Sequence, residues 1–265
     1  YSYFMKVELK VATRTEQVDM ELQARSRTVT DLLLELFAAL EERHVAYCVL
    51  RDGERFERLT EQQEIDLLVA EEQLGAFWAI AAELAFVHLR GWGHAPHHFF
   101  LKYDEGADRW LKLDVVTQLT YGRPVRTLRT TLAEGCLTRR QRCGPTYIPR
   151  AGDEFITLLL HCVLDKGGFA PERGRRLQRL IQEITQPALL SSLLANYWIP
   201  SMSWSQLASL IENGDWQTIL ACEEALVAQL SERDRLGKAI RYLRGRVLRK
   251  VNGWAGFWEP RVPMV

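Results

Sequence analysis

The sequence has few features that point to a secreted, zinc-stabilised or membrane-spanning protein. It has five cysteines in 265 residues, and none form a C-x-x-C pair. An odd, scattered set excludes a disulfide framework or a zinc ribbon and is typical of a reducing, cytoplasmic compartment. No apolar run approaches the roughly 20 residues of a membrane span. The N-terminal stretch lacks the basic-then-apolar order of a signal peptide.

Charge of one sign is not in excess either. Lysine and arginine together number 34, as do aspartate and glutamate. Such a chain has no overall field that would attract nucleic acid or an anionic membrane, so neither is an expected partner. Hydrophobic residues make up 47% and charged residues 26% of the sequence, as in ordinary globular proteins, and the length suits one large or two modest domains.

Hydrophobic periodicity predicts a mixed first half. A helix with apolar positions at three- and four-residue spacing is expected over 30–42, and another over 71–86. Residues 51–63 are polar and are expected to form a loop. Alternating or continuous apolar runs predict strands at 46–50, 64–69, 87–90, 97–103 and 110–116. A short strand or arm is expected at 6–12.

The second half changes character after the arginine-rich stretch 123–150. Helices are expected at 152–166, 173–185, 187–196, 204–213, 215–231 and 234–251. Strands first and helices after indicate an α+β chain with a helical C-terminal half. We predict an N-terminal arm over 1–27, an α/β domain over 28–150 and a helical domain over 151–265.

Acidic residues interrupt two of the predicted strands. Glu64 and Asp66 alternate with Ile65 and Leu67, so the two acids share one face of their strand. Asp114 lies between two apolar residues in a later strand. If the strands are neighbours, three carboxylates converge, and oxygen-rich clusters of this kind suit magnesium bound together with substrate phosphates. The alternative is that the acids cap strand ends or form ion pairs with the abundant arginines.

The order of these segments resembles the nucleotidyltransferase (DNA polymerase β-like) superfamily. The motifs are Tyr47-Cys48-Val49-Leu50-Arg51, Glu64-Ile65-Asp66-Leu67-Leu68-Val69 and Trp110-Leu111-Lys112-Leu113-Asp114-Val115-Val116. More narrowly, residues 28–185 are similar to bacterial nucleotidyltransferase-like regions that precede a thymidylate-kinase-like domain, often in surface-polysaccharide gene neighbourhoods. Residues 155–167 resemble the helix that follows the sheet in that group.

This resemblance implies transfer of a nucleoside monophosphate from a nucleoside triphosphate to an acceptor hydroxyl with Mg²⁺. It implies a nucleotidyltransferase-like mixed sheet with flanking helices. Glu64, Asp66 and Asp114 would bind the metal and catalyse the transfer. Arg51, Asp52 and Gly53, at the place of the superfamily's phosphate-binding turn, are expected to contact the nucleotide, with Arg51 as a cation. Lys112 shares a strand face with Asp114 and either contacts phosphate or balances the charge of the acids. The apolar ending at 261–265 resembles the strand that, in the fused architecture, leads into a phosphate-binding loop, so the resemblance implies a covalently linked kinase-like domain beyond it. The G-x-x-x-x-G-K-[ST] motif of such a loop does not occur within these residues.

Two departures from the superfamily pattern leave a second function open. Glu64 stands where the superfamily usually has aspartate, and Arg51-Asp52-Gly53 stands where it has a glycine-serine pair. A catalytically degenerate module that binds a nucleotide or partner and regulates the fused kinase-like domain is the alternative. A structural helical adaptor with ion-paired acids is the third.

Three nearby histidines form a further cluster. His94, His97 and His98 have no cysteine near in sequence, and a zinc site needs about four ligands. The pattern favours a polar strand start, with one histidine facing the active-site cleft.

Overall fold

The computed structural model describes residues 29–61, 64–89, 97–105, 108–123 and 128–233. The chain divides into two compact units. The first comprises the residues up to Leu119 together with Thr131–Glu154, and the second comprises Thr120–Thr130 and the residues from Phe155 onward. The strand predicted at 6–12, the helix predicted at 234–251 and the apolar ending at 261–265 lie outside the described residues.

The first unit is a mixed α/β unit. Its described elements are α2 (Val29–Glu42), β1 (Tyr47–Val49), α3 (Phe56–Glu61), β2 (Glu64–Val69), a 3₁₀ turn η1 (Glu71–Gln73), α4 (Leu74–Glu83), β3 (Val87–His88), β4 (His97–Asp104), β5 (Arg109–Val116), α5 (Leu132–Thr138), β8 (Gln141–Cys143), β9 (Thr146–Ile148) and the start of α6 (Ala151–Leu160).

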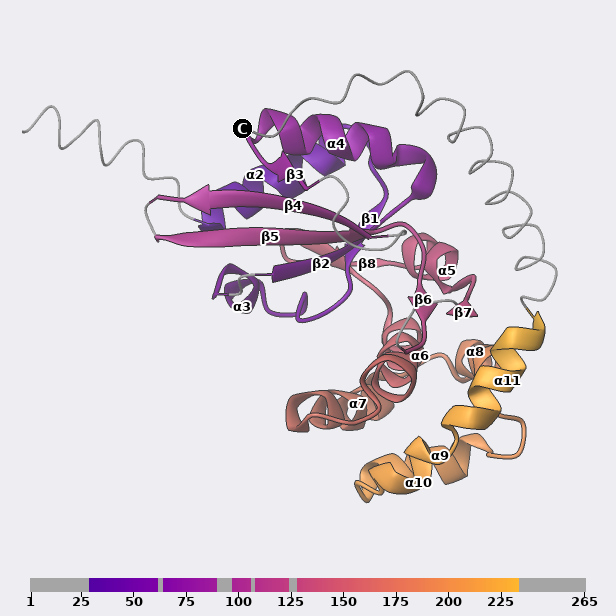
Figure 1. The fold of residues 1–265 in the computed structure, drawn as a ribbon. Coiled ribbons are helices and arrows are strands. Elements are labelled where there is room, and N and C mark those ends of the chain that lie inside the picture. Colours follow the sequence, from indigo (N-terminus) through magenta and orange to yellow (C-terminus); the bar gives the residue numbers. More distant parts are fainter. Residues whose placement is uncertain (1–28, 62–63, 90–96, 106–107, 124–127, 234–265) are drawn as a thin grey trace, which may run out of the picture. The chain divides into compact units, whose positions relative to one another are not determined.

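Five of these strands form one sheet with the order β1-β2-β5-β4-β3 (Figure 1). All neighbouring pairs are antiparallel except β2 and β5, which are parallel. In the parallel pair Glu64 lies opposite Lys112, and Asp66 lies opposite Asp114. Residues directly opposite each other point to the same face of a sheet. The predicted neighbourhood of the two acidic strands is therefore present.

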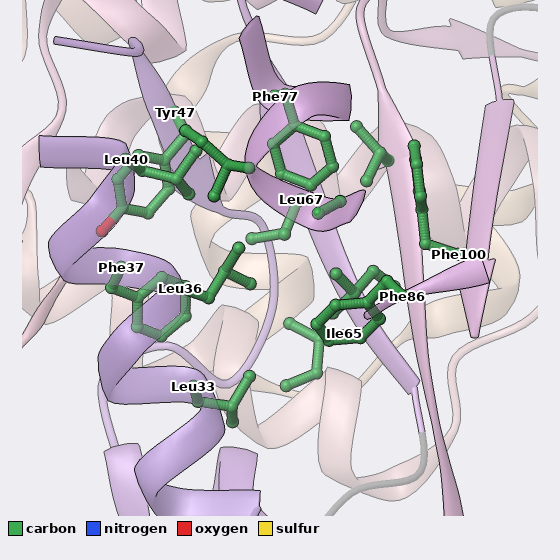
Figure 2. Packing of buried hydrophobic residues seen from close by; sticks show 14 of the residues in the cluster. Leu33, Leu36, Phe37, Leu40, Tyr47, Ile65, Leu67, Phe77, Phe86 and Phe100 are labelled. Carbon is green, nitrogen blue, oxygen red and sulfur yellow. The ribbon is translucent and has the colours of Figure 1, made fainter. Parts of the chain in front are cut away.

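The hydrophobic core lies on the other face of this sheet. Ile65 and Leu67 of β2, and Leu113 of β5, are fully buried, as are the inward residues of α2. Figure 2 shows Leu36 of α2 directed toward Leu67 of β2, and Leu40 and Tyr47 belong to the same cluster. The rings of Phe37 and Tyr47 stack with centroids 5.5 Å apart. The helix predicted over 30–42 is confirmed, since its apolar stripe packs on the sheet.

Two parts of the first unit differ from the sequence prediction. Residues 51–63 were expected to be a loop, but they contain the six-residue helix α3, anchored by the buried Leu59. A helix this short, with one fully buried apolar residue, shows no repeating hydrophobic period in the sequence. The stretch 123–150, with no predicted element, contains α5 and the β8–β9 hairpin, whose turn has Gly144 at φ 57°. Its apolar residues are too few per element to show a period.

The second unit is mostly helical, as predicted. Besides the short β6–β7 ladder (Thr120–Tyr121 with Leu128–Arg129), it contains the rest of α6, a π-helical turn η2 (His161–Lys166), α7 (Pro171–Glu183), α8 (Pro187–Tyr197), α9 (Trp204–Glu212), α10 (Trp216–Leu220) and α11 (Glu223–Arg233). The mixed α+β fold with a helical C-terminal half is confirmed.

One predicted helix is divided. Residues 215–231 were expected to form a single helix, but α10 ends at Leu220 and α11 begins at Glu223. Glu223 and Glu224 are in the first turn of α11, where carboxylates stabilise a helix N-terminus. The acidic pair therefore favours a new helix start in a stretch whose apolar spacing alone looks continuous.

Candidate metal and nucleotide site

The three predicted acids converge in the structure. Glu64 and Asp66 come from β2 and Asp114 from β5, and each contributes one carboxylate oxygen to a group whose atoms all lie within 4.8 Å of one another. The convergence follows from the parallel pairing, because Asp66 and Asp114 are direct register partners. Strand alternation places all three on the face opposite the hydrophobic core. The predicted geometry of the cluster is thus present.

The acids differ in their access to solvent. Asp114 is the most enclosed, with only 9% of the residue exposed, Asp66 is intermediate and Glu64 is exposed. The cluster therefore runs from the solvent toward the sheet interior along two adjacent strands. A ligand held by all three carboxylates would enter from the Glu64 side.

Each acid has a basic partner. Arg51 Nη1 donates to Asp66 Oδ2 at 2.8 Å, and Lys112 Nζ donates to Glu64 Oε1 at 2.8 Å. His97 Nδ1 lies 2.8 Å from Asp114 Oδ1. Arg51 and Lys112 are cations, and both are residues that the sequence analysis assigns to nucleotide binding. The structure therefore combines the predicted carboxylate cluster with the ion pairing of the alternative interpretation.

The cluster has an electrostatic cost at Asp66. Burial raises the pKa of the Asp66 carboxyl above its ordinary value, and the neighbouring charges of Asp114 and Glu64 raise it further. Arg51 opposes this shift by favouring the ionised form. Like charges this close repel one another, so the three carboxylates are clustered at a cost. Ion pairing with basic side chains would not require the acids to be so close together. A divalent cation among them would remove that repulsion.

The donor set fits a hard divalent cation. The three residues supply only carboxylate oxygens, which are the ligands that Mg²⁺ and Mn²⁺ prefer over nitrogen or sulfur. Mg²⁺ commonly takes one or two protein carboxylates and completes its shell with water and substrate phosphates. The side chains present therefore suit magnesium, and Glu64, Asp66 and Asp114 are the residues that would hold it.

The loop after β1 contributes one cation and one tightly packed glycine. Arg51 reaches Asp66 from the β1 side of β2. Gly53 is buried, and a Cβ there would lie 2.6 Å from Ile148 Cγ2 and 3.0 Å from Val49 Cβ. The close packing explains the glycine without a ligand. Asp52, between them, has a left-handed backbone with φ 56°. The nucleotide contacts assigned to Asp52 and Gly53 stay predictions.

Two further residues belong to the site, and the sequence assigned neither a role. The expectation that one histidine of the 94–98 cluster faces the cleft fits His97, which contacts Asp114, whereas His94 lies outside the described residues. The Phe99 ring lies under the Lys112 amine, 4.3 Å from its centroid. Both come from β4, where Phe99 lies opposite Asp114 in the antiparallel ladder with β5. The sequence signals were the histidine cluster and the alternation of β4, which places residues 97 and 99 on one face. The pairing register that brings this face beside Asp114 depends on the tertiary structure and cannot be derived from the local sequence.

Comparison with known proteins yields one finding. No protein-family model matches the chain, and no curated protein matches it. Among solved structures, the chain is similar to the antibiotic-resistance factor ANT(2″)-Ia, at 15% sequence identity and a TM-score of 0.41. The match covers 71% of this chain and 97% of that one. So weak a likeness supports no inference about activity, and the function of the chain is therefore inferred from the geometry of its acidic cluster.

In the part of the chain that the structure describes, no helix has both the length and the apolar character needed to cross a membrane.

Proposed function

We propose that this chain contains a Mg²⁺-dependent nucleotidyltransferase, which moves a nucleoside monophosphate from a nucleoside triphosphate to an acceptor hydroxyl. The observation that carries the proposal is the meeting of three carboxylates within 4.8 Å across the parallel β2–β5 pair. Acids gathered at such a cost, as the raised pKa of Asp66 indicates, are expected where a divalent cation and phosphates belong.

The chain's own residues have separate roles in this reaction. The acceptor oxygen forms a bond to the α-phosphorus, the bond from that phosphorus to the bridging oxygen breaks, and pyrophosphate leaves. Asp114 accepts the hydroxyl proton. Arg51 and Lys112 hold phosphate oxygens as cations. Magnesium, held by Glu64, Asp66 and Asp114, would supply charge stabilisation for the phosphoryl oxygens.

The order of the strands gives the site two sides. Arg51 approaches Asp66 from β1, whereas His97 approaches Asp114 from β4, and the sheet order is β1-β2-β5-β4. The guanidinium marks the β1 side as the place for the anionic triphosphate. The acceptor hydroxyl then approaches from the β4 side, where Asp114 lies.

The resemblance of residues 28–185 to regions before thymidylate-kinase-like domains extends this proposal. It supports a role in surface-polysaccharide metabolism and a covalently linked kinase-like domain. The scattered cysteines support a cytoplasmic location. The α/β domain over 28–150 and the helical domain over 151–265 belong to the same proposal, with residues 1–27 as an arm.

The test is label transfer from nucleoside triphosphates carrying an α-phosphate label. Purified protein with Mg²⁺ and cell extract should pass the label to an acceptor and release pyrophosphate. Asp66→Asn should reduce transfer by about a thousandfold or more, equivalent to about 4 kcal/mol of barrier. Glu83→Gln is the matched control, because it removes an exposed carboxylate paired with Arg43 outside the site. Equal transfer by Asp66→Asn and the control would refute the site.

A catalytically degenerate nucleotide- or partner-binding module is the second candidate. Each of the three acids already has a basic partner, in Arg51, Lys112 and His97. Glu64 is also one methylene longer than the aspartate usual in the superfamily. This candidate predicts nucleotide binding that is indifferent to Mg²⁺. Calorimetric titration with nucleoside triphosphate, with and without Mg²⁺, distinguishes the two.

A further inference from the structure

His97 joins the acidic cluster from a third strand. Its side chain is 13% exposed and that of Asp114 is 12% exposed, so the contact between them is largely shielded from water. Nδ1 of His97 lies 2.8 Å from Oδ1 of Asp114. An ionised carboxylate has only acceptor oxygens, so the hydrogen of this bond is on Nδ1.

The hydrogen bond restricts how Asp114 can turn. The bond engages Oδ1 of the carboxylate and does not involve Oδ2. The Phe99 ring, directly opposite Asp114 on β4, lies beside the imidazole with ring centroids 6.0 Å apart. Hydrogen bonds to a ligating carboxylate fix its orientation and commonly affect metal affinity strongly.

We propose that His97 is a positioning residue, which holds the Asp114 carboxylate in the orientation that the divalent cation requires. The inference rests on the proposed function, because it assigns Asp114 to the metal. His97 itself touches neither the metal nor the phosphates in this role. The effect of His97 depends on one N–H donor. A side-chain amide that donates from the same position should therefore replace the imidazole.

The neighbouring histidine provides a control within the same strand. His98 points to the opposite face of β4, where its ring is 5.8 Å from that of Trp78 and 6.1 Å from that of His88. Substitution there changes the same residue type at the next position without touching Asp114. A general effect of replacing a β4 histidine would therefore appear in both variants.

The experiment measures Mn²⁺ affinity by electron paramagnetic resonance, with the full chain and without nucleotide. His97→Ala should weaken Mn²⁺ binding by about tenfold or more, whereas His97→Asn should stay within about threefold of the unsubstituted protein, because its amide donates from the position of Nδ1. His98→Asn should bind Mn²⁺ as the unsubstituted protein does. Thermal unfolding of each variant verifies that it is folded. If His97→Ala does not fold, His97→Leu takes its place, because it also lacks the N–H donor.

The outcomes separate this inference from the proposed function. If Asp114→Asn loses Mn²⁺ affinity but His97→Ala does not, the inference is overturned and the proposed function stands. If His97→Asn is as weak as His97→Ala, or if His98→Asn is equally weak, the N–H donor is not the cause and the inference is again overturned. If the unsubstituted protein binds Mn²⁺ only with a non-hydrolysable nucleoside triphosphate, the variants are compared in its presence. If it binds no Mn²⁺ in either case, both fail.

Discussion

The two faces of strands β2 and β5 differ in what they carry: one packs in the hydrophobic core and the other carries the acidic cluster. On one face Ile65, Leu67 and Leu113 are fully buried in the core cluster. On the other face, one residue further along each strand, Asp66 and Asp114 meet at the candidate metal site. The same backbone therefore carries residues that pack the core and residues gathered at a cost in charge repulsion. Residues that stabilise the core and residues of the candidate site therefore occupy adjacent positions. Substitutions at adjacent positions can test whether the effects on stability and on activity are separate.

The largest expected effect comes from adjacent substitutions on β2. Leu67→Ala removes a fully buried side chain from the core and should lower the free energy of unfolding by about 3 kcal/mol. Asp66→Asn should leave it unchanged or raise it at neutral pH. The sign follows from the raised pKa of Asp66, because the ionised carboxylate disfavours the folded state above that pKa.

Urea unfolding of both variants at pH 7 makes this measurement. Leu67→Ala should retain metal-dependent labelling under conditions where it is folded, whereas Asp66→Asn should be stable and inactive. A loss of stability in Asp66→Asn as large as that in Leu67→Ala would show that the acid is a structural residue and would remove the contrast between the faces.

The second effect concerns the cation on the site face. Lys112 donates to Glu64 and lies over the Phe99 ring, yet the lysine side chain is 31% and the glutamate side chain 47% exposed. Pairs this exposed contribute at most about 1 kcal/mol to stability. Lys112→Met should thus change the free energy of unfolding little, but should raise the KM for nucleoside triphosphate about tenfold, which is about 1.4 kcal/mol.

Lys112→Arg is the matched variant, since it keeps the charge beside Glu64. Initial rates of label transfer over a range of nucleotide concentrations give KM for both. An unchanged KM in Lys112→Met would leave the lysine as the partner of Glu64 alone.

The smallest effect tests the core face of β4. Burial lowers the pKa of His98 below its ordinary value of 6.5, with His88 and His97 adding repulsion and Asp114 opposing it. The folded protein therefore takes up a proton less readily than the unfolded chain. The free energy of unfolding should fall as pH decreases below about 6.5 and through the native pKa.

His98→Asn removes the titrating group and should show a shallower decrease. Chemical unfolding of both proteins at several pH values between 8 and 5 provides the comparison. Parallel curves would show that another group causes any acid destabilisation in this range.

Local patterns were sufficient for most elements and for the three acids. The alternation of 64–69 and 110–116 predicts strands whose acids leave the core, because a strand's side-chain period is two. That these strands are neighbours was a condition of the prediction, and the register that sets Asp66 opposite Asp114 appears only in the structure. Short elements such as α3 and β8–β9 carry too few apolar residues to be predicted.

His97 shows the limit most clearly. Its own neighbours in sequence indicate a polar strand start, and nothing within 97–103 names Asp114 as a partner. The contact depends on the antiparallel register of β4 with β5, which is determined by the long ladder from His97–Val116 to Asp104–Arg109. Single-sequence reasoning has no access to that register.

The parallel pairing of β2 with β5 also bears on how the protein forms. Asp66 and Asp114 are separated by α4, β3 and β4 along the chain, whereas the β4–β5 ladder joins consecutive strands. Contacts between distant segments form slowly, because the entropy of closing the intervening loop must be overcome first. The acids therefore meet only once this long-range closure is complete. A growing chain on the ribosome cannot assemble the cluster before β5 has emerged.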